Sequence, residues 1–188
     1  MGTLDLLLDY ISRSSTTTLF VVVWLSIYFI ITVALFISRY LYLNAWAAKE
    51  NQALIRLFGD STTISAESIL YRCFSPHTNN LAVCKTVAEY NATMGLSIFS
   101  IISSTSPFIG LFGTIVSILE TFSQLGKATS ASLNIIAPAI SEALVVTAAG
   151  IFVAIPAYSA HILIKRKGYE VLNIIQREID FLVSQYEV

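Results

Sequence analysis

Long uncharged stretches alternate with short charged ones along this chain. Segments 14–38 and 90–119 hold no charged residue, and segment 128–161 holds one, Glu142. Each stretch exceeds the about 20 residues that a helix needs to cross the hydrocarbon core of a bilayer. The apolar residues are continuous rather than alternating, and a backbone in lipid must satisfy its own hydrogen bonds. The pattern therefore predicts an all-α membrane protein with three transmembrane helices.

The distribution of Lys and Arg predicts the orientation of these helices. Nine of the 11 basic residues lie after the first or the third span, and two lie on the opposite side. Basic residues accumulate in cytoplasmic segments, so we expect the N-terminus outside and the C-terminus in the cytoplasm. We expect two of the helices to extend into the cytoplasm: a helix that resumes near Leu81 runs straight into the second span, and the third span continues into the C-terminal helix. The predicted segments are an outer amphipathic segment (1–18), transmembrane helix 1 (19–43), a cytoplasmic helical region (44–92), transmembrane helix 2 (93–126), an outer turn (127–134), transmembrane helix 3 (135–164) and a cytoplasmic C-terminal helix (165–188).

Composition agrees with a membrane protein and excludes several other classes. Of the 188 residues, 55% are hydrophobic and only 12% are charged, about half the share expected in a soluble domain. A net charge of −1 lacks the basic excess of a nucleic-acid-binding domain. We find no nucleophile–base pair, so we expect no enzyme. We also expect no metal or cofactor, because the cysteines and histidines form no cluster with metal-ligand spacing: Cys73, Cys84, His77 and His161.

The second and third spans differ from the first, which is built mainly of large apolar residues. Both contain many small and hydroxyl-bearing residues, which permit close helix packing and normally face protein or water. Thr114, Ser117 and Thr121 share one helical face of the second span. Such a stripe fits two interpretations: contacts that only hold helices together, or the lining of a polar pathway.

Helix geometry also predicts which residues lie level with one another. A short turn near residue 130 joins the two spans, so antiparallel neighbours whose numbers sum to about 261 should share a depth. Thr114 and Thr147 then lie together near mid-membrane, and Glu120 and Glu142 share a level nearer the outer face. A buried carboxylate must be neutral, paired or hydrated, and two that are close would titrate as a coupled pair. Alternatively, Glu120 lies at the membrane interface, where its side chain reaches water.

Two sequence blocks carry a resemblance to a known family. Residues 106–114 read SPFIGLFGT, and residues 136–150 read IAPAISEALVVTAAG, followed by AIPA at 154–157. These blocks resemble the signature of the MotA/TolQ/ExbB proton-channel family, and the order of the spans is similar too. The likeness is to the TolQ and ExbB branch, because MotA proteins have an additional span and a larger cytoplasmic domain.

The resemblance implies a multi-pass stator subunit of the bacterial inner membrane, with a periplasmic N-terminus. It implies a homopentamer around a TolR/ExbD-like protein, whose single helix carries an aspartate, and work passed to TolA or TonB. Its pore-facing threonines correspond to Thr114 and Thr147, and its acidic residue to Glu142. We add Ser117 and Glu120 as candidate lining residues, although Glu120 replaces a non-acidic polar residue of the family. The signature residues that would pack the helices are Pro107, Gly110, Gly113, Pro138, Gly150 and Pro156.

Two other functions remain open at this stage. A structural scaffold would use the small and polar residues only for packing, and a self-sufficient ion channel would need no partner. The second and third spans contain no Asp, so the resemblance requires the titrating aspartate to come from a partner. The residues do not separate TolQ from ExbB, and the short N-terminal segment favours TolQ slightly.

Overall fold

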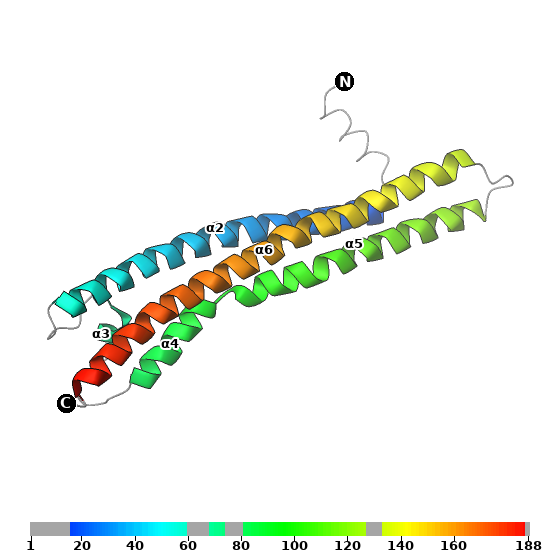
Figure 1. Ribbon diagram of the computed structural model, residues 1–188. Coiled ribbons are helices and arrows are strands. Elements are labelled where there is room, and N and C mark those ends of the chain that lie inside the picture. Colours follow the sequence, from blue (N-terminus) through cyan, green and yellow to red (C-terminus); the bar gives the residue numbers. More distant parts are fainter. Residues whose placement is uncertain (1–15, 60–67, 74–80, 127–132, 187–188) are drawn as a thin grey trace, which may run out of the picture. The chain divides into compact units, whose positions relative to one another are not determined.

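The described part of the chain consists of helices with short turns and contains no strand. The structure, a computed structural model, describes residues 16–59, 68–73, 81–126 and 133–186. The expected amphipathic segment up to residue 15 and the turn at 127–132 lie outside these residues. The helices, coloured along the chain in Figure 1, are α2 (Thr16–Gly59), α3 (Ile69–Cys73), α4 (Leu81–Thr93), α5 (Leu96–Leu125) and α6 (Leu133–Tyr186).

Three helical stretches are long and apolar enough to cross a membrane. They are Thr16–Gly59, Leu81–Leu125 and Ile136–Ser184. This confirms the prediction of an all-α chain with three candidate spans. Helix α2 is long because no Gly or Pro interrupts it before Gly59, its last residue.

A turn separates α4 from α5, where the sequence suggested one helix continuing into the second span. Gly95 in this turn has φ of +84°, a left-handed conformation that glycine adopts without the clash of a Cβ atom. The Met94 N–H still donates to the Tyr90 carbonyl oxygen at 3.0 Å. The expectation of an unbroken helix was wrong, because Gly95 adopts a left-handed backbone conformation and α4 ends at Thr93.

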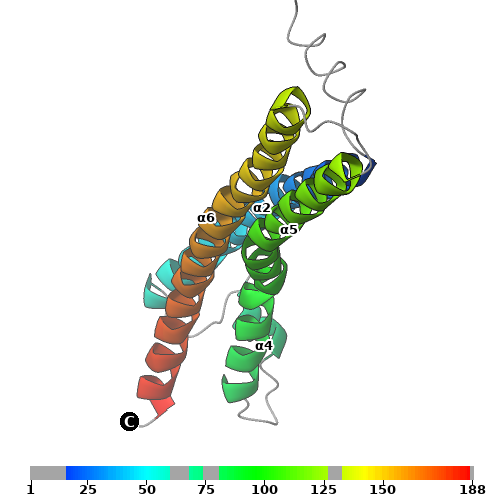
Figure 2. The ribbon, with the colours of Figure 1, turned by 90° about the vertical axis from the view of Figure 1, so that its right-hand side faces the viewer.

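The chain divides into two compact units, each described by itself. Unit 1 comprises the described residues within 1–33 and 98–159. In it, α5 and α6 run side by side in opposite directions (Figures 1 and 2). Its core is a cluster of small and branched apolar residues from α2, α5 and α6: Val21, Leu25, Ile102, Val146, Val153 and Ala157.

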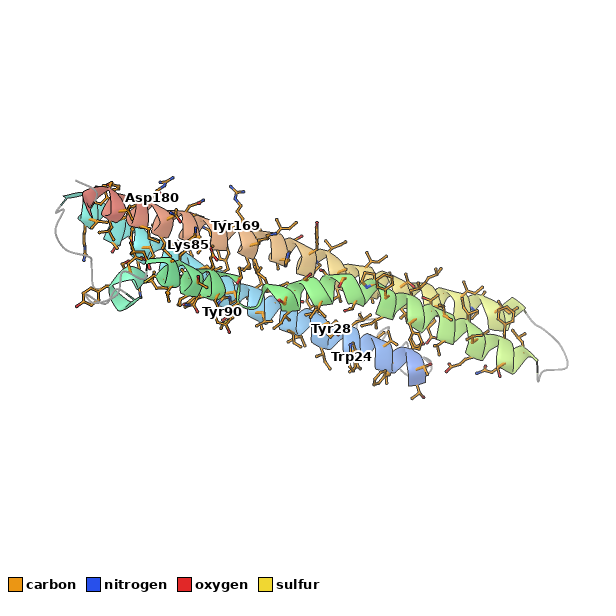
Figure 3. The ribbon with its side chains drawn as sticks, turned by 90° about the horizontal axis from the view of Figure 1, so that it is seen from below. Trp24, Tyr28, Lys85, Tyr90, Tyr169 and Asp180 are labelled. Atoms are coloured by element: carbon orange, nitrogen blue, oxygen red, sulfur yellow. The ribbon has the colours of Figure 1, made fainter. Side chains whose placement is uncertain are left out.

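The surface of unit 1 carries large apolar side chains. Trp24 is 44% exposed, and its ring centroid lies 6.0 Å from that of Tyr28 along α2 (Figure 3). Other exposed residues come from all three helices: Phe20, Ile30, Phe108, Phe112, Leu144 and Phe152. Such a surface is typical of helices that face lipid or other membrane helices.

Unit 2 comprises the described residues within 34–97 and 160–188. Four helices contribute to its core, which includes Ala47, Leu57, Leu70, Cys84, Ala88, Val171, Ile175, Ile179 and Leu182. Its surface is more polar, and Lys85, Tyr90, Tyr169 and Asp180 are exposed there (Figure 3). The two longest helices, α2 and α6, each contribute residues to both units.

Candidate functional site

Two glycines bring the backbones of α5 and α6 into direct contact in unit 1. A Cβ atom on Gly110 would lie 3.0 Å from the Val146 carbonyl oxygen and 3.2 Å from the Cα of Gly150. A Cβ atom on Gly150 would lie 2.6 Å from the Ser106 carbonyl oxygen. Real Cβ atoms do not come as close to a backbone oxygen as one on Gly150 would, and one on Gly110 would be closer than most real Cβ contacts. The close approach of the two helices therefore depends on the missing side chains.

A third glycine, Gly113 of α5, lies against both α6 and α2. A Cβ atom on Gly113 would lie 2.5 Å from Cγ1 of Val146 and 3.2 Å from Cγ1 of Val21. Helices α2, α5 and α6 therefore converge at this level of unit 1. The predicted packing residues Gly110, Gly113 and Gly150 all lie at the contact, which is a geometric finding and leaves their role in transport a prediction.

The hydroxyl groups of Thr114 and Thr147 are hydrogen-bonded to each other beside this glycine contact. Thr114 Oγ1 also lies 3.2 Å from the Gly110 carbonyl oxygen and 3.1 Å from that of Ala143. Thr147 Oγ1 lies 3.5 Å from the same Gly110 oxygen. Both threonines are half-buried. Helix geometry predicts from the sequence that these two residues lie level, and in the structure they are in contact.

The two hydroxyls can exchange donor and acceptor roles. Each hydroxyl carries one proton and two lone pairs, and two backbone carbonyls offer further acceptors. The group therefore holds more acceptor positions than protons, and several arrangements of the protons satisfy it. An arrangement of this kind can pass a proton or hydrate an incoming group without carrying a permanent charge.

Both helices that form this site contain prolines. Pro107 lies inside α5, and Pro138 and Pro156 lie inside α6. Proline has no N–H, so each removes one backbone hydrogen bond from its helix. Ser106, directly before Pro107, is fully buried, and its hydroxyl has no hydrogen-bond partner among the described residues. The contact between α5 and α6 thus contains polar backbone and side-chain groups as well as glycines.

Glu120 has a partner that the sequence did not suggest. Its Oε1 accepts a hydrogen bond of 2.8 Å from the hydroxyl of Thr17, in the first turn of α2. The predicted coupling of Glu120 to Glu142 stays a prediction. A signal for the observed contact exists in the sequence, because Thr16, Thr17 and Thr18 place three hydroxyls at the start of an otherwise apolar span.

Glu142 and Ser117 lie on the same side of the threonine pair, because α5 continues past Thr114 to Ser117 and α6 passes Glu142 before it reaches Thr147. Glu142 is half-buried and directly precedes Ala143, whose carbonyl oxygen is near Thr114. Ser117 is buried, with 5% of its surface exposed, and lies one turn after Thr114 on α5. Ser117 is three residues from Thr114 and Glu142 is five residues from Thr147, so they lie about 4.5 Å and about 7.5 Å along their helices from the hydroxyl pair.

The described residues contain no group of three His, Cys, Asp or Glu side chains that could hold a metal ion. Cys84 is buried in the core of unit 2. His161 Nδ1 lies 3.2 Å from the Leu96 carbonyl oxygen, which requires a proton on that nitrogen. His77 and the side chain of Cys73 lie outside what the structure describes.

Comparison with known proteins gives one family and several relatives. Residues 75–177 match the MotA/TolQ/ExbB proton channel family. A Helicobacter pylori protein named as biopolymer transport protein ExbB-like 1 is 37% identical over 187 residues, which is 97% of this chain and 99% of the relative.

Shorter matches come from both branches of the family. Biopolymer transport protein ExbB of Pseudomonas putida is 36% identical over 106 residues, 50% of this chain and 32% of that protein. Tol-Pal system protein TolQ of Haemophilus influenzae is 50% identical over 60 residues, 32% of this chain and 26% of that protein. The matched family region contains the glycine contact, the threonine pair, Glu120 and Glu142.

Proposed function

Because the chain belongs to the MotA/TolQ/ExbB proton channel family, in its TolQ/ExbB branch, we propose that it is a stator subunit of a proton-driven motor. The proposed location is the bacterial inner membrane, with the N-terminus in the periplasm and the C-terminus in the cytoplasm. Five copies surround the transmembrane helix of a TolR/ExbD-like partner. Proton flow drives this partner, and the work reaches the outer membrane through a TolA-like or TonB-like protein.

The observation that carries this proposal is the hydrogen-bonded pair of Thr114 and Thr147. The pair lies within the family match and beside a backbone contact that only glycine permits. Each hydroxyl hydrogen can point to the other hydroxyl or to a backbone carbonyl oxygen, which suits a group that receives and passes on a proton. A permanent charge at this depth would instead bind a cation or block the pathway.

The predicted transmembrane segments 93–126 and 135–164 contain no Asp, which supports the need for a partner. In the proposed mechanism the partner's carboxyl group accepts a proton near the threonine pair and releases it on the other side. Glu142, at the start of the same region of α6, would influence how readily that carboxyl group is protonated. One charge moved through 100 mV yields about 2.3 kcal/mol, so several protons per cycle can drive mechanical work.

The exposed apolar surface of unit 1 supports an assembly within the membrane. Large side chains such as Phe108, Phe112 and Phe152 are between 63% and 71% exposed. In the proposed pentamer these groups contact lipid and neighbouring copies of the chain. The scaffold alternative uses the same surface, so transport measurements have to separate the two.

The test replaces each threonine of the pair with valine, which keeps the shape and removes the hydroxyl. We expect Thr147→Val and Thr114→Val to reduce proton uptake by at least tenfold in liposomes that contain the chain and its TolR/ExbD-like partner. Thr147→Ser should retain most of the activity, because it keeps the hydroxyl. Thr105→Val is the matched control, since its hydroxyl donates to the Ile101 carbonyl oxygen of its own helix at 2.7 Å and lies outside the stripe of Thr114, Ser117 and Thr121.

The outcomes separate the competing functions. If the valine variants assemble with the partner and transport normally, the scaffold function is favoured and the proposal is wrong. Proton uptake by the chain alone would favour a self-sufficient channel. A deletion strain distinguishes the branches: loss of siderophore or vitamin uptake indicates an ExbB-like role, whereas detergent sensitivity and division defects indicate a TolQ-like role. The near full-length ExbB-like relative supports the first of these.

A further inference from the structure

Two acidic side chains are almost completely buried in unit 2. Glu50 of α2 is 1% exposed, and Glu178 of α6 is 2% exposed. Among the residues that the structure describes, neither forms a salt bridge with Lys or Arg. A buried carboxylate without a cation is costly, because it loses its hydration and gains no opposite charge. The pair therefore needs another source of stabilisation.

One short segment at the start of α3 binds both carboxyl groups. The Ile69 N–H donates to Glu50 Oε1 at 3.0 Å, and the Ser68 hydroxyl donates to Glu178 Oε2 at 2.8 Å. Trp46 Nε1 also donates to Glu50 Oε1, at 2.8 Å. The Ser68 oxygen in turn accepts from the Leu70 N–H at 3.1 Å. The two carboxyl groups thus fasten α3 to α2 and to α6.

Each carboxyl group also keeps one oxygen without a partner. Glu50 Oε2 and Glu178 Oε1 are buried and have no hydrogen-bond partner among the described residues. Glu50 receives two N–H donors on its other oxygen, whereas Glu178 receives one hydroxyl. Donors to an ionised carboxylate favour that form, so Glu178, which receives a single hydroxyl, is well suited to carry a proton.

The electrostatics of Glu178 agree with this assignment. Burial raises the pKa of Glu178 to about 7, the Ser68 hydrogen bond opposes that rise, and negative Glu50 adds to it. Among the described side chains of this unit, Glu50 and the thiol of Cys84 are the other buried titratable groups. Other charged side chains on these helices are exposed: Lys49 and Arg56 on α2, Lys85 and Glu89 on α4, and Arg177 and Asp180 on α6.

We propose that Glu50 and Glu178 form a proton-binding site that holds one proton between them and thereby controls how firmly α3 is attached to α2 and α6. With the proton bound, one of two buried charges is removed and α3 stays attached. When the proton is lost, the two carboxylates repel each other and the segment opens more often. The site uses groups outside the threonine pair, so it does not depend on the proposed transport function.

The test measures the hydrogen-exchange protection of the Ile69 and Leu70 amides in the full chain in lipid nanodiscs. In the opened state Glu178 regains its ordinary pKa near 4.5, so opening becomes more frequent as pH rises from about 4.5 to about 7. We expect protection, corrected for intrinsic exchange, to fall more than tenfold from pH 5 to pH 7 and then to level off.

Matched variants decide whether Glu178 is responsible. Glu178→Gln should abolish the fall, and Glu170→Gln, on an exposed residue of the same helix, should leave it unchanged. Glu50→Gln keeps an acceptor oxygen but removes the negative charge that raises the pKa of Glu178, so hydrogen-exchange protection should level off at a lower pH. This variant tests the proposal if Glu178→Gln does not fold. The proposal is overturned if wild-type protection is constant from pH 5 to pH 7, if the fall persists in Glu178→Gln, or if protection depends on added calcium instead of pH.

Discussion

Gly150 of α6 lies directly against the backbone of α5 at Gly110. A Cβ atom on Gly150 would stand 3.0 Å from the Cα of Gly110 and 2.6 Å from the Ser106 carbonyl oxygen. The threonine pair lies one turn or less from these glycines on each helix. The hydroxyls of Thr114 and Thr147 can therefore meet because the two backbones beside them touch.

The first prediction concerns this backbone contact. Gly150→Ala should destabilise the chain by about 1–3 kcal/mol, because the added methyl group forces two backbones apart. Thermal unfolding of the purified chain in detergent measures the change. Gly59→Ala is the control, since a Cβ atom there meets nothing within 4 Å. Equal unfolding midpoints for Gly150→Ala and the wild type would contradict the observed contact.

The second prediction separates two roles of Glu120. Glu120→Gln keeps an oxygen that can accept from Thr17, so stability should change little. Thr17→Val removes the donor and should cost about 0.5–1.5 kcal/mol. If Glu120 shares a proton with Glu142, only Glu120→Gln should alter the pH dependence of proton uptake. Normal uptake by this variant across the pH range would rule out the coupling.

The third prediction concerns Arg39, which holds the end of α4. Its Nη2 donates to the carbonyl oxygens of Asn91 at 2.8 Å and Ala92 at 3.5 Å, and its guanidinium lies 5.3 Å from the ring centre of Tyr42. Arg39→Gln removes the charge, which complements the negative end of the helix. We expect a loss of about 1.5–3 kcal/mol, measured by thermal unfolding.

Lys167→Gln is the control for Arg39→Gln, because Lys167 pairs with an exposed glutamate on its own helix. Exposed pairs of this kind contribute about 0.2–1 kcal/mol or less. Hydrogen exchange of α4 should also be faster in Arg39→Gln. A variant with wild-type stability and unchanged exchange would show that the arginine does not hold α4.

The fourth prediction is a pH dependence of stability that has its origin in Glu178. Its folded pKa of about 7 lies above the ordinary value of 4.5, so the folded chain binds this proton more tightly than the unfolded chain. The contribution of Glu178 to stability is therefore greatest below pH 4.5, decreases as pH rises to about 7 and is constant above that.

Glu178→Gln should thus unfold at a higher temperature than the wild type at pH 8, and at a similar temperature at pH 5. The gain at pH 8 should not exceed about 3 kcal/mol, the free energy that corresponds to the difference between the two pKa values. Glu170→Gln should follow the wild type at both values. A difference that is equally large at pH 5 would indicate changed packing instead of a removed charge.

The sequence alone determined the features that depend on regular helix geometry. Continuous apolar stretches predicted the three candidate spans, because length and composition decide whether a helix can cross a bilayer. The rise per residue placed Thr114 and Thr147 level, because two antiparallel helices joined by a short turn advance equally per residue. The two sequence blocks identified the family, which the match over residues 75–177 shows.

Only the tertiary structure decided which side chains meet across helices. Thr17 contacts Glu120, and one segment of α3 binds both Glu50 and Glu178, although 110 residues separate Ser68 from Glu178. Such contacts depend on the rotation of each helix about its axis and on its lateral neighbours, and neither follows from periodicity within one helix. The turn at Gly95 is also a feature that only the tertiary structure decided. A glycine permits a left-handed backbone conformation, but tertiary packing decides whether it forms there.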